Sequence, residues 1–204
     1  MNAARTLAAE RTADIERSTL ETRITASLNL EGGSVDAATG VPFLDHMLDA
    51  LGRHGRFGLT VRCEGDAAMD PHHTVEDVGI AIGLAIRDAL GDRRGIARYG
   101  HAYAPLDESL ARAVIDCSGR PFLYFAAEMP EPVIGRDFAS SLVEEFWRGL
   151  IINAALTAHI ELIRARNAHH AAEAIFKSGA LALHAATRRT GDQGSIPSTK
   201  GILA

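Results

Sequence analysis

The sequence predicts an α+β fold built from two similar halves. The word His-His-x-x-Glu occurs twice, at residues 72–76 and 169–173, with an offset of 97 residues. Each word opens a segment whose apolar residues have helical spacing, and each segment follows the same order of strands, helix and strand. Such internal similarity predicts two units related by approximate two-fold symmetry, each burying one sheet face beneath its helices.

The first half contains three extended runs and two helical ones. We expect strands at 15–30, 34–39 and 59–63 and helices at 43–57 and 74–90. The pair Gly32-Gly33 between the first two runs is a hairpin signal. Pro42 favours the start of the first helix, and Gly91 favours the end of the second.

The second half repeats this order. We expect strands at 98–104, 110–116, 120–126 and about 159–164 and helices at 138–158 and 169–188. Ser118-Gly119 is the expected turn between the second and third of these strands. The chain then divides into a half-domain at 1–93, a half-domain at 94–190 and a C-terminal tail at 191–204.

Composition and charge exclude several classes of protein. The 204 residues carry a formal net charge of −5 with scattered Lys and Arg, so no binding surface for nucleic acid or anionic membranes is expected. No apolar run approaches the roughly 18 residues that span a bilayer, and residues 1–17 lack the apolar core of a signal peptide. Cys63 and Cys117 lie in strand-like runs without CxxC spacing and are expected to be reduced core residues. We therefore expect a soluble, cytoplasmic protein.

The repeated word is typical of a metal site. Residues three or four apart on a helix share a face, so the Glu of each word can join one His at an ion while the other His points elsewhere. Each word could therefore supply ligands to two ions. Imidazole with carboxylate suits Mn, Fe, Ni or Zn, and the absence of thiolate argues for an open catalytic ion rather than a structural zinc.

The C-terminal tail has two interpretations that the sequence does not separate. Its glycines and Pro197 are typical of a disordered tail. Alternatively, Ser198-Thr199-Lys200 offers a hydroxyl and an ammonium that could close over a phosphate.

Several motifs together resemble one enzyme family. They are Phe43-Leu44-Asp45-His46-Met47-Leu48, the two His-His-x-x-Glu words, Pro105-Leu106-Asp107-Glu108, Ser118-Gly119-Arg120-Pro121 and Pro197-Ser198-Thr199-Lys200-Gly201. In this order and spacing, from about Arg11 to Gly201, the chain closely resembles the imidazoleglycerol-phosphate dehydratases, manganese enzymes of histidine biosynthesis. The resemblance implies two β-β-β-α-β-α halves, assembly of 24 subunits, and two Mn²⁺ ions per active site at subunit contacts.

The resemblance also implies a set of functional residues. The metal ligands fall on His46, His72, His73, Glu76, His169, His170 and Glu173. The phosphate-binding residues fall on Arg98, Arg120, Lys177, Ser198 and Lys200. Glu21 is implied as a substrate-binding carboxylate that moves protons, with Asp107 and Glu173 as further catalytic carboxylates. From the residues alone, Glu21 fits an exposed strand glutamate and each arginine fits a solvated surface group, whereas Asp107 fits a turn residue after Pro105 and a catalytic acid or base equally.

The implied reaction is dehydration of imidazoleglycerol phosphate to imidazole acetol phosphate. A metal on the imidazole ring lowers the cost of its anionic form, so the ring can expel the hydroxyl through a diazafulvene-type intermediate. Loss of the proton from the neighbouring carbon then gives an enol, and protonation of the carbon beside the ring converts the enol to the ketone.

One position departs from the implied pattern. The duplication pairs residues 44–47 with 143–146, and the family usually carries a further ligand His where this chain has Glu145. Three interpretations stay open: a working carboxylate ligand, a position with weakened metal affinity, or a substituted variant of an ordinary enzyme. We expect the substitution Glu145→His to tighten metal binding and raise turnover.

Two other functions remain compatible with these residues. A dinuclear metallohydrolase would use two ions to activate water against a phosphoester or amide. A metal-dependent oligomer without activity is suggested by Glu145, although a pure scaffold has no need for phosphate-binding residues.

Overall fold

The computed structural model describes residues 11–65, 70–190, 194–196, 198–199, 201 and 203. The first half contains β1 (Thr12–Ser18), β2 (Thr22–Asn29), β3 (Val35–Ala38), α1 (Pro42–Gly55), β4 (Gly58–Gly65) and α2 (His72–Leu90). The second half contains β5 (Tyr99–Leu106), β6 (Ser109–Asp116), β7 (Phe122–Ala126), β8 (Val133–Ile134), β9 (Phe138–Ala139), α3 (Leu142–Asn153), β10 (Thr157–Arg164) and α4 (Ala168–Thr187).

The two halves share one topology, which confirms the predicted α+β fold. The sheets have the orders β1-β2-β4-β3 and β5-β6-β10-β7. In each sheet the first three strands in this order pair antiparallel, whereas β3 pairs parallel with β4 and β7 parallel with β10. The second half adds the short hairpin β8-β9 before its first helix.

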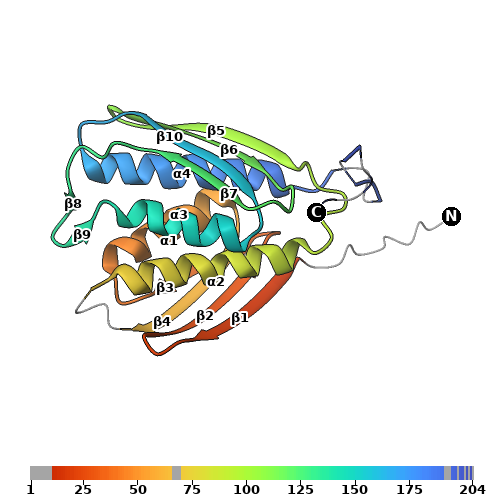
Figure 1. The fold of residues 1–204 in the computed structure, drawn as a ribbon, viewed down its shortest axis with the longest axis horizontal. Helices are drawn as coiled ribbons and strands as arrows, with labels where there is room; N and C mark the ends of the chain where they lie inside the picture. The colour runs from red at the N-terminus through yellow and green to blue at the C-terminus, as the bar shows by residue number, and fades with distance from the viewer. Residues whose placement is uncertain are drawn as a thin grey trace.

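The four helices lie between the two sheets (Figure 1). α2 packs on β1 and β2, while α4 packs on β5 and β6. The helices also pair across the halves, α1 with α4 and α2 with α3. The largest buried side chains of this central layer, Trp147, Phe146 and Phe176, contact one another with ring centroids 4.9–5.8 Å apart. The central layer therefore joins the halves through one shared core.

Glycine permits the close approach of α2 and α3. A Cβ on Gly79 would lie 2.4 Å from the carbonyl oxygen of Phe146, and one on Gly149 would lie 2.7 Å from the carbonyl oxygen of Glu76. Backbone contacts at these distances leave no room for a side chain. The start of α3 is thereby fixed against the start of α2.

The predicted hairpin at Gly32-Gly33 is wrong. The first turn lies at residues 19–21, where Thr19 Oγ1 accepts hydrogen bonds from the backbone N–H groups of Glu21 and Thr22 at 3.1 and 3.0 Å. β3 pairs parallel with β4 and not with β2. A hydroxyl that stabilises a turn without Gly or Pro left no clear signal inside the run 15–30.

The predicted helix at 138–158 is too long at both ends. Phe138–Ala139 forms β9, and α3 begins only at Leu142. Beyond Asn153, Ala155 adopts a left-handed conformation with φ of 51°, and β10 begins at Thr157. Apolar spacing continued through both ends, and neither end carries the usual Gly or Pro boundary.

Neither cysteine forms a disulfide, as the sequence predicted. Cys117 is buried and Cys63 is half-buried. Burial raises the pKa of the Cys117 thiol to about 12, so this thiol is not a nucleophile at neutral pH. In the part of the chain that the structure describes, no helix combines the length and apolarity needed to cross a membrane.

Candidate metal centre and active site

Both His-His-x-x-Glu words stand at the first turn of a helix, as predicted. α2 begins at His72, whose N–H donates to Asp70 Oδ1 at 2.9 Å. α4 begins at Ala168, and the side chain of Asn167 caps it by accepting from the N–H of His170 at 3.0 Å. The short polar residues before each word therefore set where the histidines project.

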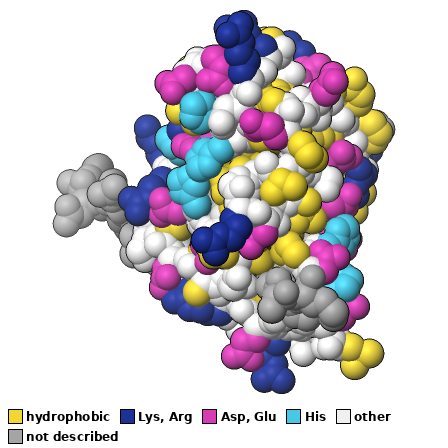
Figure 2. Space-filling view, turned by 90° about the vertical axis from the view of Figure 1, so that its left-hand side faces the viewer, with side chains coloured by type: hydrophobic (Ala, Val, Ile, Leu, Met, Phe, Trp, Pro, Cys, Tyr) yellow, Lys and Arg dark blue, Asp and Glu magenta, His cyan; other side chains and the backbone are white. Residues whose placement is uncertain are grey.

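The helix starts lie at one end of the molecule. The ring of Phe43, at the start of α1, contacts those of His169 and Phe138 at 5.3 and 4.8 Å between centroids. Figure 2 views this end and shows the histidine side chains in two separate groups, each beside acidic side chains. We call this surface the ligand end.

The first group joins α1 to α4. His46 Nε2 lies 3.5 Å and His169 Nε2 3.3 Å from the same oxygen, Glu173 Oε2. One donor atom from each residue lies within 4.8 Å of the others, as a shared metal ion requires. The sequence predicted all three as ligands, and the fold brings them together within one chain.

Lys177 orients the carboxylate of this group. Its Nζ lies 2.7 Å from Glu173 Oε1, which leaves Oε2 facing the two imidazoles. Burial works to raise the pKa of Glu173, but the hydrogen bond and charge of Lys177 together with His46 hold it below its usual value. The carboxylate is therefore ionised and available to a cation at neutral pH.

A second set of possible ligands lies beside the first group, at the turn between β5 and β6. His170 Nδ1 lies 2.9 Å from Glu108 Oε2, and Asp107 completes a set of three possible ligands. The hydrogen bond from His170 is the main reason that the pKa of Glu108 falls to about 2, and Glu108 in turn raises the pKa of His170. Glu108 was not predicted as a site residue from the sequence.

The duplication could have identified Glu108. Glu21 ends the β1–β2 turn as Glu108 ends the β5–β6 turn, each one residue before the next strand. Glu21 Oε1 lies 3.7 Å from His73 Nε2, the counterpart of the His170 contact. Each half therefore places a turn glutamate against the second histidine of its word.

The remaining predicted ligands are less closely gathered. His72 Nε2 and Glu76 Oε2 lie 3.8 Å apart. Glu145 Oε2 lies 3.8 Å from Arg148 Nε, and within the described residues Glu145 belongs to no set of three possible metal ligands. Of the predicted ligands, only His46, His169 and Glu173 form such a set by themselves in one chain.

The predicted phosphate-binding arginines lie at the opposite end of the molecule. Arg98 Nε donates to Asp116 Oδ1 at 2.7 Å, and Arg120 Nη2 lies 3.8 Å from Asp116 Oδ2. The N–H of Arg98 donates to the carbonyl of Ala186 near the end of α4, roughly 25 Å along that helix from His169 at 1.5 Å per residue. We call this surface the arginine end.

The other predicted phosphate contacts divide between the two ends. Ser198 lies in the tail, where its N–H donates to Ile196 and nearby Ser195 accepts from Gly95, just before Arg98 in the chain. Lys200 lies outside the described residues. Lys177 contacts Glu173 at the ligand end instead.

Comparison with known proteins identifies the family. A family model described as imidazoleglycerol-phosphate dehydratase matches residues 39–183. The chain is 54% identical over 195 residues to the imidazoleglycerol-phosphate dehydratase of Aromatoleum aromaticum and 52% identical over 197 residues to that of Hydrogenovibrio crunogenus. Each alignment covers 95% of this chain and 100% of the relative. The chain belongs to the imidazoleglycerol-phosphate dehydratase family.

Solved structures of imidazoleglycerol-phosphate dehydratases agree. The enzyme of Staphylococcus aureus superposes with a TM-score of 0.78 at 41% identity, covering 88% of this chain and 99% of that one. The enzyme of Pyrococcus furiosus, solved in complex with (S)-C348, gives a TM-score of 0.80 at 32% identity, covering 93% and 100%. The resemblance noted in the sequence is confirmed, and the protein is a hydro-lyase of histidine biosynthesis.

The side chains at the ligand end fit the metal chemistry expected of an imidazoleglycerol-phosphate dehydratase. The His46 group offers two imidazole nitrogens and one ionised carboxylate oxygen, a donor set that suits Mn²⁺, Fe²⁺ or Zn²⁺. A cavity of about 620 Å³ lies directly beside it, with His46, Phe43 and Arg136 in its lining. This volume falls in the usual range for small-molecule sites.

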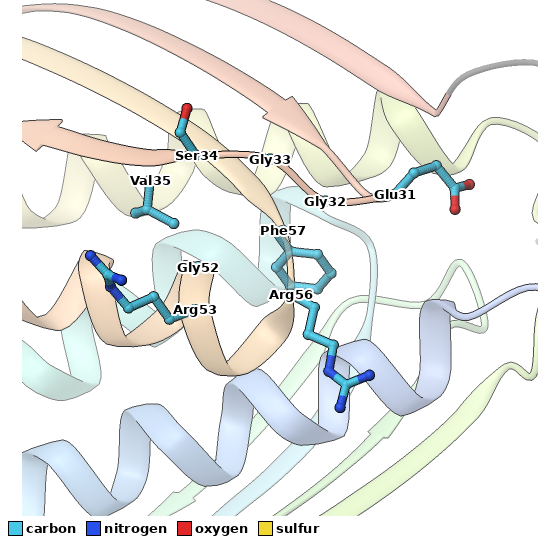
Figure 3. Close-up of a pocket in the computed structure, with 9 residues that line it drawn as sticks. All are labelled: Glu31, Gly32, Gly33, Ser34, Val35, Gly52, Arg53, Arg56 and Phe57. Atoms are coloured by element: carbon cyan, nitrogen blue, oxygen red, sulfur yellow. The ribbon is translucent and has the colours of Figure 1, made fainter.

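A second cavity has a different character. It measures about 470 Å³ and lies where α1 ends, lined by Gly32, Gly33, Arg53, Arg56 and neighbouring residues. Figure 3 shows the charged side chains of Glu31, Arg53 and Arg56 pointing in different directions, so their polar groups do not converge on a ligand. The cavity beside His46 is the better candidate for the imidazoleglycerol-phosphate dehydratase site.

Proposed function

We propose that this enzyme dehydrates imidazoleglycerol phosphate to imidazole acetol phosphate with two Mn²⁺ ions per active site. The observation that carries the proposal is the group formed by His46, His169 and Glu173, whose donor atoms already face one another beside a cavity. Family membership supports the substrate and the reaction class.

Two clusters of side chains would hold the ions. The proposed ligands are His46, His72, His73, Glu76, Glu145, His169, His170 and Glu173. Bound there, the metal would supply Lewis-acid stabilisation of negative charge on the imidazole ring. Glu108, on His170, and Glu21, on His73, are placed to fix ring orientation or to receive a proton.

Carboxylates of the ligand end are the proposed proton carriers. The reaction removes a proton from carbon, expels hydroxide through a diazafulvene-type intermediate and returns a proton at the neighbouring carbon. Glu21 is the first candidate, because its exposed side chain lies beside a proposed ligand without being one itself. Asp107 is the second candidate, at a turn with a left-handed φ of 47°. The proposed part of Glu173 is to hold the cation with an ionised oxygen.

Substrate phosphate would bind at the arginine end. Arg98 and Arg120 both face Asp116, so two guanidinium groups converge where a dianion could be held by bidentate bonds. Ser198 and Lys200 of the tail at 191–204 would close over the same phosphate. Lys177 would neutralise charge beside Glu173.

A homo-oligomer follows from this separation. The ligand end and the arginine end of one chain lie too far apart to contact one small substrate, so different copies must contribute to each active site. The outer face of the second sheet supports self-association, because it exposes Tyr99, Tyr103, Val114, Phe122 and Tyr124. In the described residues, strands β1 to β4 expose no comparable apolar side chain. We propose an assembly of 24 subunits working in the cytoplasm, where a biosynthetic enzyme meets its substrate and thiols stay reduced.

Product analysis tests the proposed function against its rivals. Protein loaded with Mn²⁺ is incubated separately with imidazoleglycerol phosphate and with a simple phosphoester, and ketone and free phosphate are measured. The proposal predicts ketone from the first and no phosphate from either. Free phosphate would indicate a metallohydrolase, and an unchanged substrate would indicate an inactive scaffold.

A further inference from the structure

The duplicated fold provides an internal comparison for Glu145. Residues 44–47 of α1 correspond to 143–146 of α3, so Glu145 holds in the second half the place that His46 holds in the first. His46 faces the word at the start of α4. By the same pairing, Glu145 belongs beside the word at the start of α2.

The packing of α3 on α2 supports that correspondence. The carbonyl of Phe146, directly after Glu145, lies against Gly79, and Gly149 lies against the carbonyl of Glu76. Both approaches leave no space for a Cβ, so α3 cannot slide along α2. Glu145 therefore stands at a ligand position by its place in the fold.

The side chain at this position has a cationic partner that His46 lacks. Arg148 Nε lies 3.8 Å from Glu145 Oε2, and the same guanidinium donates to Glu144. The residue of α1 that corresponds to Arg148 is Asp49, an anion. A divalent cation bound by Glu145 would have to displace or tolerate a positive charge about one helical turn away, and like charges at such a distance repel.

The word at 72–76 also lacks a counterpart of the lysine that orients the carboxylate of the word at 169–173. Lys177 holds Oε1 of Glu173, whose side chain is only 16% exposed. The corresponding residue of α2 is Ile80, and the side chain of Glu76 is 42% exposed. A carboxylate fixed in advance loses less freedom on binding than one that must be ordered by the ion.

We infer that Glu145 makes the two metal positions of this enzyme unequal, with the position served by His72, Glu76 and Glu145 the weaker one. The inference rests on the proposed function, because that function requires both positions. Two imidazoles and an oriented carboxylate serve the position of His46, whereas one imidazole and two less ordered carboxylates serve the other. Ions should therefore fill the protein in two steps rather than one.

Manganese titration of the metal-free, full-length protein tests this directly. Free Mn²⁺ is measured by its electron paramagnetic resonance signal, so the readout does not depend on turnover. The native protein should show two classes of site at least about tenfold apart, and Glu145→His should tighten the weaker class by about 10–100-fold, the usual range for changes around a metal. Arg148→Ala should tighten the weaker class by a smaller factor.

Matched variants locate the effect. His46→Glu places the same carboxylate in the other half and should remove the tight class, while Asp88→Asn removes an exposed carboxylate at the far end of α2 and should leave both classes as in the native protein. Circular dichroism and particle size confirm that each variant is folded. Two equal classes in the native protein, or a weaker class unaffected by Glu145→His, would overturn the inference.

The dehydration assay on the same samples separates the two claims. If the native protein binds Mn²⁺ in two unequal classes and Glu145→His tightens the weaker class, but no sample forms ketone, the inference is supported and the proposed function is refuted. Ketone formation with a single class of equal sites would support the function and refute the inference.

Discussion

The two ends of this molecule prepare their side chains in different ways. At the ligand end, His46 and His169 share one oxygen of Glu173, and the charge that balances the carboxylate, Lys177, sits on the other oxygen. At the arginine end, Arg98 and Arg120 are instead paired with a carboxylate, Asp116. One end thus offers an ionised carboxylate oxygen, Glu173 Oε2, to a cation, and the other offers positive charge that a phosphate must share with Asp116.

The difference shows that the two sets of proposed site residues lie at opposite ends of the helices. The proposed metal ligands lie at helix starts, whereas the proposed phosphate-binding arginines lie in loops beside the far end of α4, roughly 25 Å away. A rigid central layer keeps these ends apart. The account therefore requires that one substrate be held by different copies of the chain.

The largest effect is expected at the ligand end. His169→Ala removes one of two imidazoles from the first group and should lower kcat by roughly 10²–10³-fold, since metal polarisation contributes several kcal/mol. Steady-state kinetics with metal analysis measures it. If His169→Ala kept full activity and the native metal content, His169 would not be a metal ligand of the active site.

The arginine end should respond in KM. Arg120→Ala removes a side chain that is 61% exposed, so the fold should be kept while the substrate loses a charge-assisted bond, and KM should rise roughly tenfold. kcat should change little. Arg53→Ala, an exposed arginine paired with Asp49 elsewhere on the surface, is the control and should leave KM as it is.

The central layer should respond in stability. Gly149→Ala places a Cβ 2.7 Å from the carbonyl oxygen of Glu76 and should cost about 1–3 kcal/mol, the usual range for overpacking. Urea unfolding measures it. Gly91→Ala is a useful contrast, because space around Gly91 is open and its cost comes from the positive φ alone. An unchanged midpoint for Gly149→Ala would contradict the close helix contact.

The smallest effect is expected at Glu31, which joins the start of the first half to the end of the second half. Glu31 pairs with Arg11 and Arg189, and the hydrogen bond from Arg11, opposed by partial burial and aided by Arg189, lowers the pKa of Glu31. Because the pKa of Glu31 is lower in the folded protein than in the unfolded chain, ionised Glu31 stabilises the folded state at pH values above the unfolded pKa near 4.5. This contribution is lost as the pH falls through the folded-state pKa.

Glu31→Gln therefore tests a pH-dependent contribution. It should cost about 0.5 kcal/mol at pH 7, a small figure because the pair is partly exposed, and the difference should shrink as the pH falls below 4.5. Urea unfolding over a series of pH values from 7 downward measures it. A difference that does not shrink as the pH falls would mean that the ion pairs are not its source.

Much of the fold could be predicted from periodicity. The duplication, four helices and most strand positions follow from apolar spacing and from the repeated word. The turn at Thr19 could not be predicted, because a side-chain hydroxyl replaces Gly or Pro there. The ends of α3 were missed because apolar residues continue past them into β9 and β10.

The sequence predicted which residues belong to the site better than it predicted which of them lie next to one another. The sequence identified His46, His169 and Glu173, but only the fold shows that α1 of one half meets α4 of the other. Glu108 stands in the motif Pro105-Leu106-Asp107-Glu108, but its contact with His170 was missed because the two residues lie 62 positions apart, although its counterpart Glu21 was named. The separation of Arg98 from the histidines is a property of helix length that no motif records.

Complementation between defective subunits tests the central claim most directly. His169→Ala subunits and Arg98→Ala/Arg120→Ala subunits, each strongly impaired alone at substrate concentrations below the native KM, are dissociated, mixed and reassembled, and dehydration is measured at such a concentration. If each active site takes its ligand end and its arginine end from different copies, the mixture regains activity, whereas mixing His46→Ala with His169→Ala, which damage the same group, regains none. No recovery from the first mixture, with mixed particles demonstrated, would contradict the account.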